Sequence, residues 1–314
     1  MTRYRKLMAR RAFLIKASAM PIALIIPPVT RGASTSAAVS SPRVFDQGYT
    51  VDPSIVSPNQ EPRIHTLVLH YTATSLAHAL DILTDPARGV SAHYLVPDAA
   101  GPDGRFLVFA LVPEARLAHH AGVSYWLGER LVNGTSIGIE IVNLGYGDGY
   151  DKGEDDLPLM KRDWHPYLAE QIAVVGRLAA DIVARHGIAP THVVGHADVA
   201  PGRKVDPGPY FPWRRLYEDY GVGAWPDEAT VEYYRHNAPY HDDIGELQAK
   251  LLAYGYDAPQ SGELDARTVS VISSFQMHFC PARYDGVPDV DTVAVLDALL
   301  EKYFGAKRPP CRTA

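Results

Sequence analysis

Apolar and polar residues follow two different periods along the chain, and strand-like and helix-like segments alternate over residues 63–222. Residues 64–71 and 136–143 alternate with a period of two, which predicts strands that bury one face. Residues 165–186 carry apolar side chains at helical spacing, and Gly187 predicts where that helix ends. A central sheet covered by helices is the simplest way to bury both patterns. We therefore expect an α/β domain with a mixed sheet flanked by helices.

Shorter segments complete this domain. We expect a helix at 75–84 and short strands at 91–97, 106–112 and 191–196, the last of which ends in His196. The proline-rich run at 208–213 predicts an irregular segment over one side of the domain.

The end of the chain has a different pattern. Residues 243–303 contain two similar units that predict three helices joined by glycine-containing turns. The apolar positions that mark these helices are Leu247, Leu251, Val271, Phe275, Val293 and Leu296. At about 60 residues such a module has a minimal core and could fold alone. Residues 39–62 and 223–242 are expected to be linkers, and 304–314 a tail.

The first 38 residues resemble an export signal. A basic head is followed by an apolar stretch from Phe13 to Ile26, and small residues then offer a cleavage site. The stretch is short for a membrane span, and no cysteine near the cleavage region could carry a lipid anchor. Arg10-Arg11 predicts the twin-arginine route, with an ordinary secretory signal as the alternative. We expect export to the periplasm or cell envelope.

Composition narrows the class of protein. The hydrophobic fraction of 46% and the charged fraction of 21% fit a soluble globular protein. The formal charge of −6 argues against nucleic acid as a partner. The only two cysteines are Cys280 and Cys311, which either pair or remain free thiols. Thirteen histidines prompt a search for metal or acid–base sites. Composition says nothing about the oligomeric state.

Two histidines and an aspartate are candidate metal ligands. His70 lies at the end of the first predicted strand, His196 at the end of the last, and Asp206 follows. A catalytic zinc ion takes three such ligands and leaves a fourth position open. On spacing alone this is a weak signal, because any histidine-rich chain offers such triples.

Five short strings in succession make the signal specific. They are HYT at 70–72, SAHYLV at 91–96, LAHHAG at 117–122, NGTSIGIEIVN at 133–143 and GHADVAPGRKVDPG at 195–208. Together they resemble the type 2 family of N-acetylmuramoyl-L-alanine amidases, which are zinc enzymes related to peptidoglycan recognition proteins. The resemblance covers roughly residues 60–215.

The resemblance implies an activity and its residues. The family hydrolyses the amide between N-acetylmuramic acid, or its anhydro form, and the L-alanine of the peptidoglycan stem peptide. His70, His196 and Asp206 match the ligands of one zinc ion per chain. Glu140 matches the acid that activates the attacking water, and it lies on the polar face of its predicted strand. Lys204 matches the lysine that stabilises charge on the substrate oxygen.

Several residues are expected to contact substrate. His120 lies in a string that resembles a Trp-His-Ala-Gly segment of the family, but His119 stands where that segment has tryptophan. Tyr71, Asn133 and Arg203 could line the cleft, and Arg203 could pair with a carboxylate of the stem peptide. Asp198 either orients a metal ligand or caps a turn, and we favour the turn.

The C-terminal module resembles a peptidoglycan-binding domain of the three-helix repeat type, in which Asp265 and Thr268 match the start of a helix. The resemblance implies that the module tethers the enzyme to the wall, while a structural cap without a ligand is the alternative. Two other functions remain open, a non-catalytic protein that holds peptidoglycan and a glycosidase that cuts its sugar chain. The sequence does not decide between intact wall and anhydro fragments as substrate.

Overall fold

The computed structural model describes residues 43–45, 48–148 and 157–310 of the chain. The predicted signal peptide at 1–38 lies outside these ranges, as does Cys311, so export and a disulfide with Cys280 stay predictions. Cys280 itself is partly buried and forms no disulfide with any other residue that the structure describes.

The chain divides into two compact units after Gln60. The first unit contains an antiparallel ribbon of β1 (Arg43–Phe45) and β2 (Tyr49–Val51). Everything described below belongs to the second unit. In the part of the chain that the structure describes, no helix combines the length and the apolar character that crossing a membrane requires.

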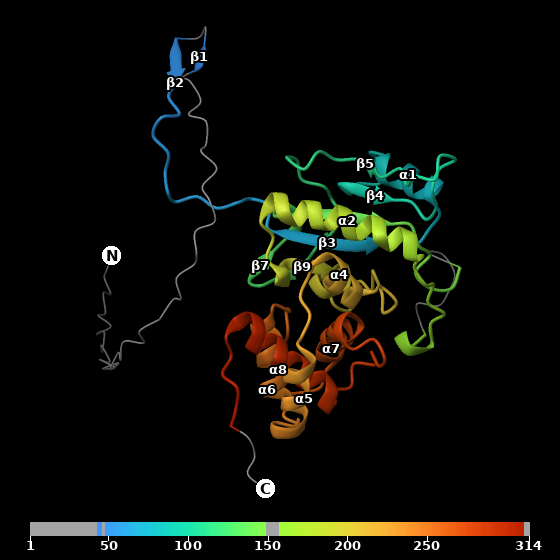
Figure 1. Cartoon of the computed structure of the whole chain (residues 1–314), viewed down its shortest axis with the longest axis vertical. Coiled ribbons are helices and arrows are strands. Elements are labelled where there is room, and N and C mark those ends of the chain that lie inside the picture. Colours follow the sequence, from blue (N-terminus) through green and yellow to red (C-terminus); the bar gives the residue numbers. More distant parts are fainter. Residues whose placement is uncertain (1–42, 46–47, 149–156, 311–314) are drawn as a thin grey trace, which may run out of the picture. The chain divides into compact units, whose positions relative to one another are not determined.

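The second unit is built on a five-stranded sheet with the strand order β5–β4–β8–β3–β9 (Figure 1). Its strands are β3 (Thr66–Tyr71), β4 (Tyr94–Val96), β5 (Phe109–Ala110), β8 (Ser136–Ile141) and β9 (Val193–Gly195). Strands β4, β8, β3 and β9 run parallel, and β5 is antiparallel to β4 at one edge. The predicted mixed sheet is confirmed.

Helix α2 (Ala169–His186) covers one face of this sheet (Figure 1). The apolar positions of the two central strands meet it in one core, made of Leu67, Leu69, Ile137, Ile139, Ile141, Ile172, Val175, Ala179 and Ile182. The helix begins four residues later than the apolar pattern predicted. Pro166 disfavours helical backbone at His165, and Leu168, directly before the helix, is extended. It ends as predicted at Gly187, whose φ of 65° lies in the left-handed region.

The opposite face of the sheet carries the polar positions of the same strands. His70 on β3 lies directly beside Glu140 on β8 in the parallel register. Helices α1 (Leu76–Thr84) and α3 (His196–Val199) pack on this face. His196 therefore begins a helix, and the prediction that it ends a strand is wrong. The reason is local, since the Asp198 carboxylate accepts the Gly195 N–H and caps a helical turn at this point.

The remaining elements connect and extend this arrangement. They are the ribbon β6 (Tyr125–Trp126) and β7 (Glu129–Arg130), the 3-10 turns η1 (Val132–Gly134), η2 (Leu159–Lys161) and η3 (Pro190–His192), and the helices α4 (Trp213–Tyr220), α5 (Glu228–Asn237), α6 (Ile244–Tyr254), α7 (Ala266–Phe279) and α8 (Val290–Phe304). Helices α6, α7 and α8 are the three expected in the C-terminal module. Helix α5 occupies part of the segment expected to be a linker, and it packs with Val231 and Tyr234 buried.

The two similar units of the C-terminal module share one hydrogen-bonding pattern. In the first, the amide of Gln248 donates to Thr268 and accepts from the N–H of Gly262. In the second, the amide of Gln276 donates to Thr292 and accepts from the N–H of Gly286. Both threonine N–H groups are capped by an aspartate three residues earlier, Asp265 or Asp289. The internal repeat therefore reflects a duplicated turn held by a buried glutamine.

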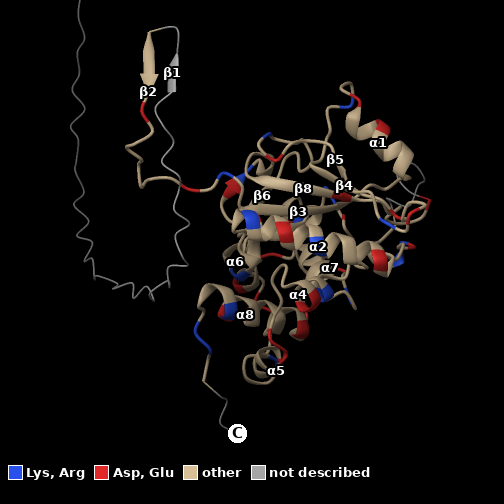
Figure 2. Ribbon diagram, turned by 45° about the horizontal axis from the view of Figure 1, so that its top comes forward, with Lys and Arg blue, Asp and Glu red and all other residues tan. Residues whose placement is uncertain are grey.

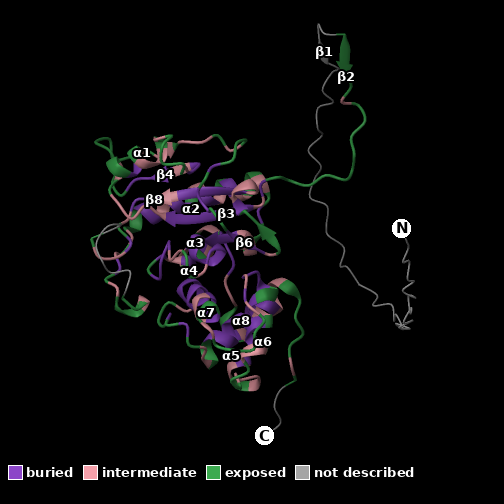
Figure 3. Ribbon diagram, turned by 180° about the vertical axis from the view of Figure 1, so that it is seen from behind, coloured by how far each residue is buried: buried purple, intermediate pink, exposed green. Residues whose placement is uncertain are grey.

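The C-terminal module shares a hydrophobic core with the sheet. Val68 and Val194 from the sheet belong to the same buried cluster as Val271 and Phe275 from α7. Figure 3 shows buried residues continuing from the strands through α3 into α7 and α8. Residues of both charges are interspersed along α2 (Figure 2). The module is thus packed against the α/β domain as one body.

Candidate active site

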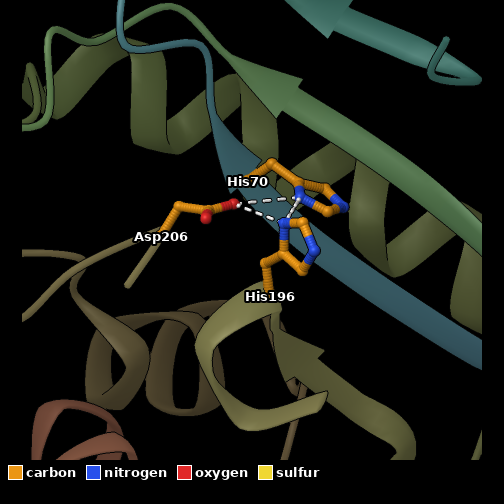
Figure 4. A group of neighbouring side chains, drawn as sticks. All are labelled: His70, His196 and Asp206. Carbon is orange, nitrogen blue, oxygen red and sulfur yellow. Dashed lines mark hydrogen bonds and ion pairs between the residues drawn. The ribbon is translucent and has the colours of Figure 1, made fainter. Parts of the chain in front are cut away.

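Three side chains from distant parts of the sequence meet on the polar face of the sheet (Figure 4). His70 Nδ1 lies 3.0 Å from His196 Nδ1 and 3.0 Å from Asp206 Oδ2, and His196 Nδ1 lies 3.1 Å from the same oxygen. They come from β3, from the first turn of α3 and from the loop that follows α3. All three residues are buried.

The three ligand atoms fit a zinc ion better than they fit one another. If both Nδ1 atoms carried protons for Asp206, two N–H donors would face each other at 3.0 Å, which is unfavourable. A tetrahedral zinc ion with bonds of about 2.1 Å holds its ligand atoms about 3.4 Å apart, close to the spacing seen here. Two imidazole nitrogens and a carboxylate oxygen are also donors that zinc prefers.

The electrostatics of the three residues suit metal binding. Burial and the nearby His196 lower the pKa of His70 to about 4, so its imidazole is neutral at pH 7. Burial alone would raise the pKa of Asp206, but the imidazoles of His196 and His70 outweigh it and hold this pKa below its usual range. A neutral imidazole and an ionised carboxylate are the forms that bind a cation.

The outer nitrogens of both histidines have defined partners. His196 Nε2 lies 3.1 Å from the carbonyl oxygen of Ala121. His70 Nε2 lies 3.0 Å from His120 Nδ1, and His120 Nε2 lies 3.1 Å from Ser136 Oγ. With both Nδ1 lone pairs on a metal, each Nε2–H donates outward. Such outer contacts fix the tautomer and the orientation of metal-ligating histidines.

The His120 ring is fixed in a narrow space. The Ser136 hydroxyl donates to the carbonyl oxygen of Val132 at 2.7 Å, which leaves its oxygen to accept from His120. A Cβ atom on Gly138 would come within 2.5 Å of the His120 ring, so glycine is required there. His120 is therefore placed to orient His70, a contact that the sequence does not predict.

Glu140 and Lys204 line a cleft of about 880 Å³ together with His196 and Asp206. Oε2 of Glu140 is buried and has no hydrogen-bond partner among the described residues. Burial raises the pKa of Glu140 well above its usual range, Asp206 adds to this, and Lys204 opposes it. A buried, unpaired carboxylate of raised pKa is a suitable proton acceptor.

The expected substrate contacts have different positions. Tyr71 and Arg203 line the cleft, whereas Asn133 is not among the residues that line it. Asn133 Oδ1 instead accepts the N–H groups of His120 and Ala121, and so holds the loop that carries His120. Arg203 Nη2 donates to the carbonyl oxygens of Ala121 and Val123, at 2.6 and 2.7 Å, and so holds the same loop.

The sequence did not predict a role near the site for Ser136, or for Tyr256 and His278 of the C-terminal module. Ser136 shares a strand face with Glu140, four residues later, and this alternation was a usable signal. Asp198 was predicted to cap a turn, which it does, but it also accepts hydrogen bonds from Tyr256 and His278 in the C-terminal module. Nothing in the local sequence of those two residues points to Asp198.

Comparison with protein families identifies both parts of the second unit. Residues 60–209 match the family described as N-acetylmuramoyl-L-alanine amidase. Residues 240–296 match a putative peptidoglycan binding domain.

Individual relatives match over most of the chain. The chain is 43% identical to the N-acetylmuramoyl-L-alanine amidase AmiD of Escherichia coli over 265 residues, which is 83% of this chain and 91% of that protein. The structure of AmiD in complex with anhydro-N-acetylmuramic acid-L-Ala-D-gamma-Glu-L-Lys matches with a TM-score of 0.74 at 42% identity, over 83% of this chain and 97% of that one. The structure of AmpDh3 from Pseudomonas aeruginosa matches with a TM-score of 0.70 at 39% identity, over 83% and 98%.

Proposed function

The chain belongs to the N-acetylmuramoyl-L-alanine amidase family and hydrolyses the amide between N-acetylmuramic acid and L-alanine in peptidoglycan, and we propose that it does so with one zinc ion held by His70, His196 and Asp206. The observation that carries the zinc site is the triangle of Nδ1, Nδ1 and Oδ2 atoms beside a cleft lined by Glu140. A zinc ion bound there lowers the pKa of water to about 7 and polarises the substrate carbonyl.

Glu140 is the proposed general base and acid. Its buried, unpaired Oε2 takes a proton from the attacking water as the new C–O bond forms at the lactyl carbonyl carbon. The same carboxyl then gives that proton to the amide nitrogen as the C–N bond breaks. The products are the lactyl carboxylic acid on the sugar and a stem peptide with a free amino terminus.

Lys204 is the proposed partner of the charge that develops on the carbonyl oxygen. Lys204 lines the cleft, and no described side chain forms a hydrogen bond or ion pair with its ammonium group. A fixed cation at this place stabilises the transition state more than the neutral substrate. The proposed substrate-binding residues remain Tyr71, His120, Arg203 and Asn133. Arg203 and Asn133 would act by holding in place the loop at 121–123 and its neighbour His120.

Anhydro-muropeptides are proposed substrates. The matching structures of AmiD and AmpDh3 were solved in complex with anhydro-N-acetylmuramic acid-L-Ala-D-gamma-Glu-L-Lys and with anhydromuramic pentapeptide, respectively. At identities of 42% and 38% over 83% of this chain, the same ligand class is expected to fit its cleft.

Product analysis tests the proposed function. Purified protein is incubated with anhydro-muropeptides, and the products are identified by mass spectrometry. We expect free stem peptide from the wild type, none after the metal has been stripped, and recovery on addition of zinc. New reducing sugar ends with an intact lactyl amide would instead indicate a glycosidase. Stoichiometric zinc without release of peptide would indicate a non-catalytic recognition protein.

The contact between His120 and His70 leads to a separate prediction. Replacing His120 by alanine removes the acceptor for His70 Nε2–H, and we expect zinc affinity to fall by about 10- to 100-fold. Competition with a chromophoric chelator measures this affinity. His119→Ala is the matched control, because His119 is the exposed neighbour and makes no contact with His70. Equal affinities in the two variants would contradict the orienting role.

We further propose that the enzyme is exported to the periplasm or cell envelope by the twin-arginine route, without a lipid anchor. The proposal rests on Arg10-Arg11 and the following apolar stretch, and on the absence of cysteine near the cleavage region. Outside the cytoplasm the enzyme would meet peptidoglycan directly, and the C-terminal module is proposed to contribute to binding it.

A further inference from the structure

We propose that the C-terminal helical module positions a metal ligand, in addition to any part it has in holding the wall. Tyr256 and His278 of the module bind the Asp198 carboxylate, and through it they hold the short helix that begins with His196. This inference rests on the zinc site of the proposed function. It assigns positioning roles to two residues that contact neither the metal ligands nor the cleft.

The Asp198 carboxylate receives three hydrogen bonds in a buried setting. Its Oδ2 accepts the N–H of Gly195 at 2.7 Å and lies 2.8 Å from His278 Nδ1, while its Oδ1 accepts the Tyr256 hydroxyl at 2.6 Å. Asp198 is 1% exposed, His278 5% and Tyr256 0%. A buried carboxylate is destabilising unless its oxygens accept hydrogen bonds. Removal of a donor in the module therefore leaves an unsatisfied oxygen in residues 195–206, the metal segment, which carries both His196 and Asp206.

Packing fixes the directions from which the module donates. The His278 ring is stacked against Trp213 at 3.8 Å and against Phe279 at 3.9 Å between ring centroids. The Tyr256 ring meets Trp126 edge-on at 5.0 Å. Because these rings cannot turn freely, the Tyr256 hydroxyl and His278 Nδ1 are both held facing the Asp198 carboxylate. The carboxylate is therefore held by preorganised groups and not by flexible surface side chains.

The Asp198 carboxylate controls the helical turn that carries His196. It caps the first turn of α3 through Gly195, the residue before His196. The next residue, Ala197, donates its N–H to the carbonyl oxygen of Asp206 at 2.8 Å, so the same turn also holds the second ligand. A Cβ atom on Gly195 would lie 2.6 Å from Pro207. Because this turn is tightly packed, we expect a shift of Asp198 to move both His196 and Asp206.

A module that only tethered the enzyme would need none of these contacts. A tether acts by effective concentration and is compatible with a polar, separable interface. Here Val199 and Ala200, directly after Asp198, share a buried cluster with Val271 and Phe275 of α7. The same surface that joins the two parts therefore carries the polar contact to the metal segment.

The decisive experiment compares two single-atom deletions in the full-length chain. Tyr256→Phe removes the hydroxyl that donates to Asp198. Tyr234→Phe is the matched control, because Tyr234 is 4% exposed and its hydroxyl donates to Glu301 at 2.9 Å, away from the metal segment. Zinc affinity is measured by chelator competition, and kcat and KM are measured with an anhydro-muropeptide.

We expect Tyr256→Phe to weaken zinc binding by about tenfold, at the lower end of the effect of outer contacts on metal sites. The same variant should lower kcat while KM stays within twofold. Tyr234→Phe should leave both quantities within twofold of the wild type. Equal zinc affinities and kcat values in the two variants would overturn the proposal.

A second pair of variants provides rescue. His278→Ala removes the donor to Asp198 Oδ2, whereas His278→Asn keeps an N–H donor close to the position of Nδ1. We expect His278→Asn to bind zinc more tightly than His278→Ala, and the reverse order would count against the positioning role. A wild-type protein that binds no zinc would refute the zinc site itself, because the wild type and every variant would then fail alike.

Discussion

Replacement of Glu140 by glutamine lowers kcat by about 10²- to 10⁴-fold, the usual contribution of a positioned general base. Glutamine has nearly the same shape, but its amide cannot take a proton from water. Zinc binding should remain at one ion per chain, because Glu140 is not among the three clustered ligand residues. The rate of stem-peptide release from an anhydro-muropeptide and the zinc content of the purified variant measure the two effects.

Glu170→Gln is the control for this experiment. It makes the same chemical change on an exposed position of α2, on the other side of the sheet from the cleft. Its kcat should equal that of the wild type. The stability of Glu140→Gln adds a second readout, because Oε2 of Glu140 is buried without a partner. We expect the free energy of unfolding of the metal-free variant to be no lower than that of the wild type. A Glu140→Gln enzyme that keeps more than a tenth of wild-type kcat would rule out the assigned role.

Replacement of His196 by alanine abolishes zinc binding at micromolar zinc and reduces activity to background. Two ligands remain, and a catalytic zinc site requires three. The loss is also visible without any assay of activity. Zinc at 100 times its Kd raises the free energy of unfolding of the wild type by about 2.7 kcal/mol, and it should not stabilise His196→Ala. Thermal or denaturant unfolding with and without zinc measures this difference.

His192→Ala serves as the control for the metal ligand. His192 precedes His196 by four residues and ends the turn η3, and it is not part of the clustered ligand set. It should therefore respond to zinc as the wild type does. If both variants lost the stabilisation equally, the effect would reflect damage to this segment and not the removal of a ligand.

The period-two pattern of residues 136–141 is the part of the site that sequence reasoning described best. It buries Ile137, Ile139 and Ile141 against α2, so Glu140 must face the other side of the sheet. Strand periodicity is a local property, since successive side chains point to opposite faces whatever the rest of the chain does. The glycine that ends α2 was predicted for the same reason, whereas the cap at Asp265 followed from the family resemblance.

The sequence predicted the boundaries of short strands less accurately than those of the long helix α2. The segments expected to be strands at 91–97 and 106–112 contain only the three residues of β4 and the two of β5. The strand predicted at 191–196 ends one residue before His196, because the Asp198 carboxylate caps a helix that begins there. In each case a hydrogen-bond partner decided the structure, and apolar patterns do not report hydrogen-bond partners.

Sequence by itself determined which side chains face the core, which residue types could bind zinc, and, through the order of its motifs, the family of the enzyme. Only the tertiary structure decided the contacts between groups far apart in the chain. His70 lies 126 residues from His196 and 136 from Asp206, and Asp198 lies 58 residues from Tyr256 and 80 from His278. The physical reason is that periodicity encodes the environment of a side chain, whereas its partner depends on how sheet and helices pack.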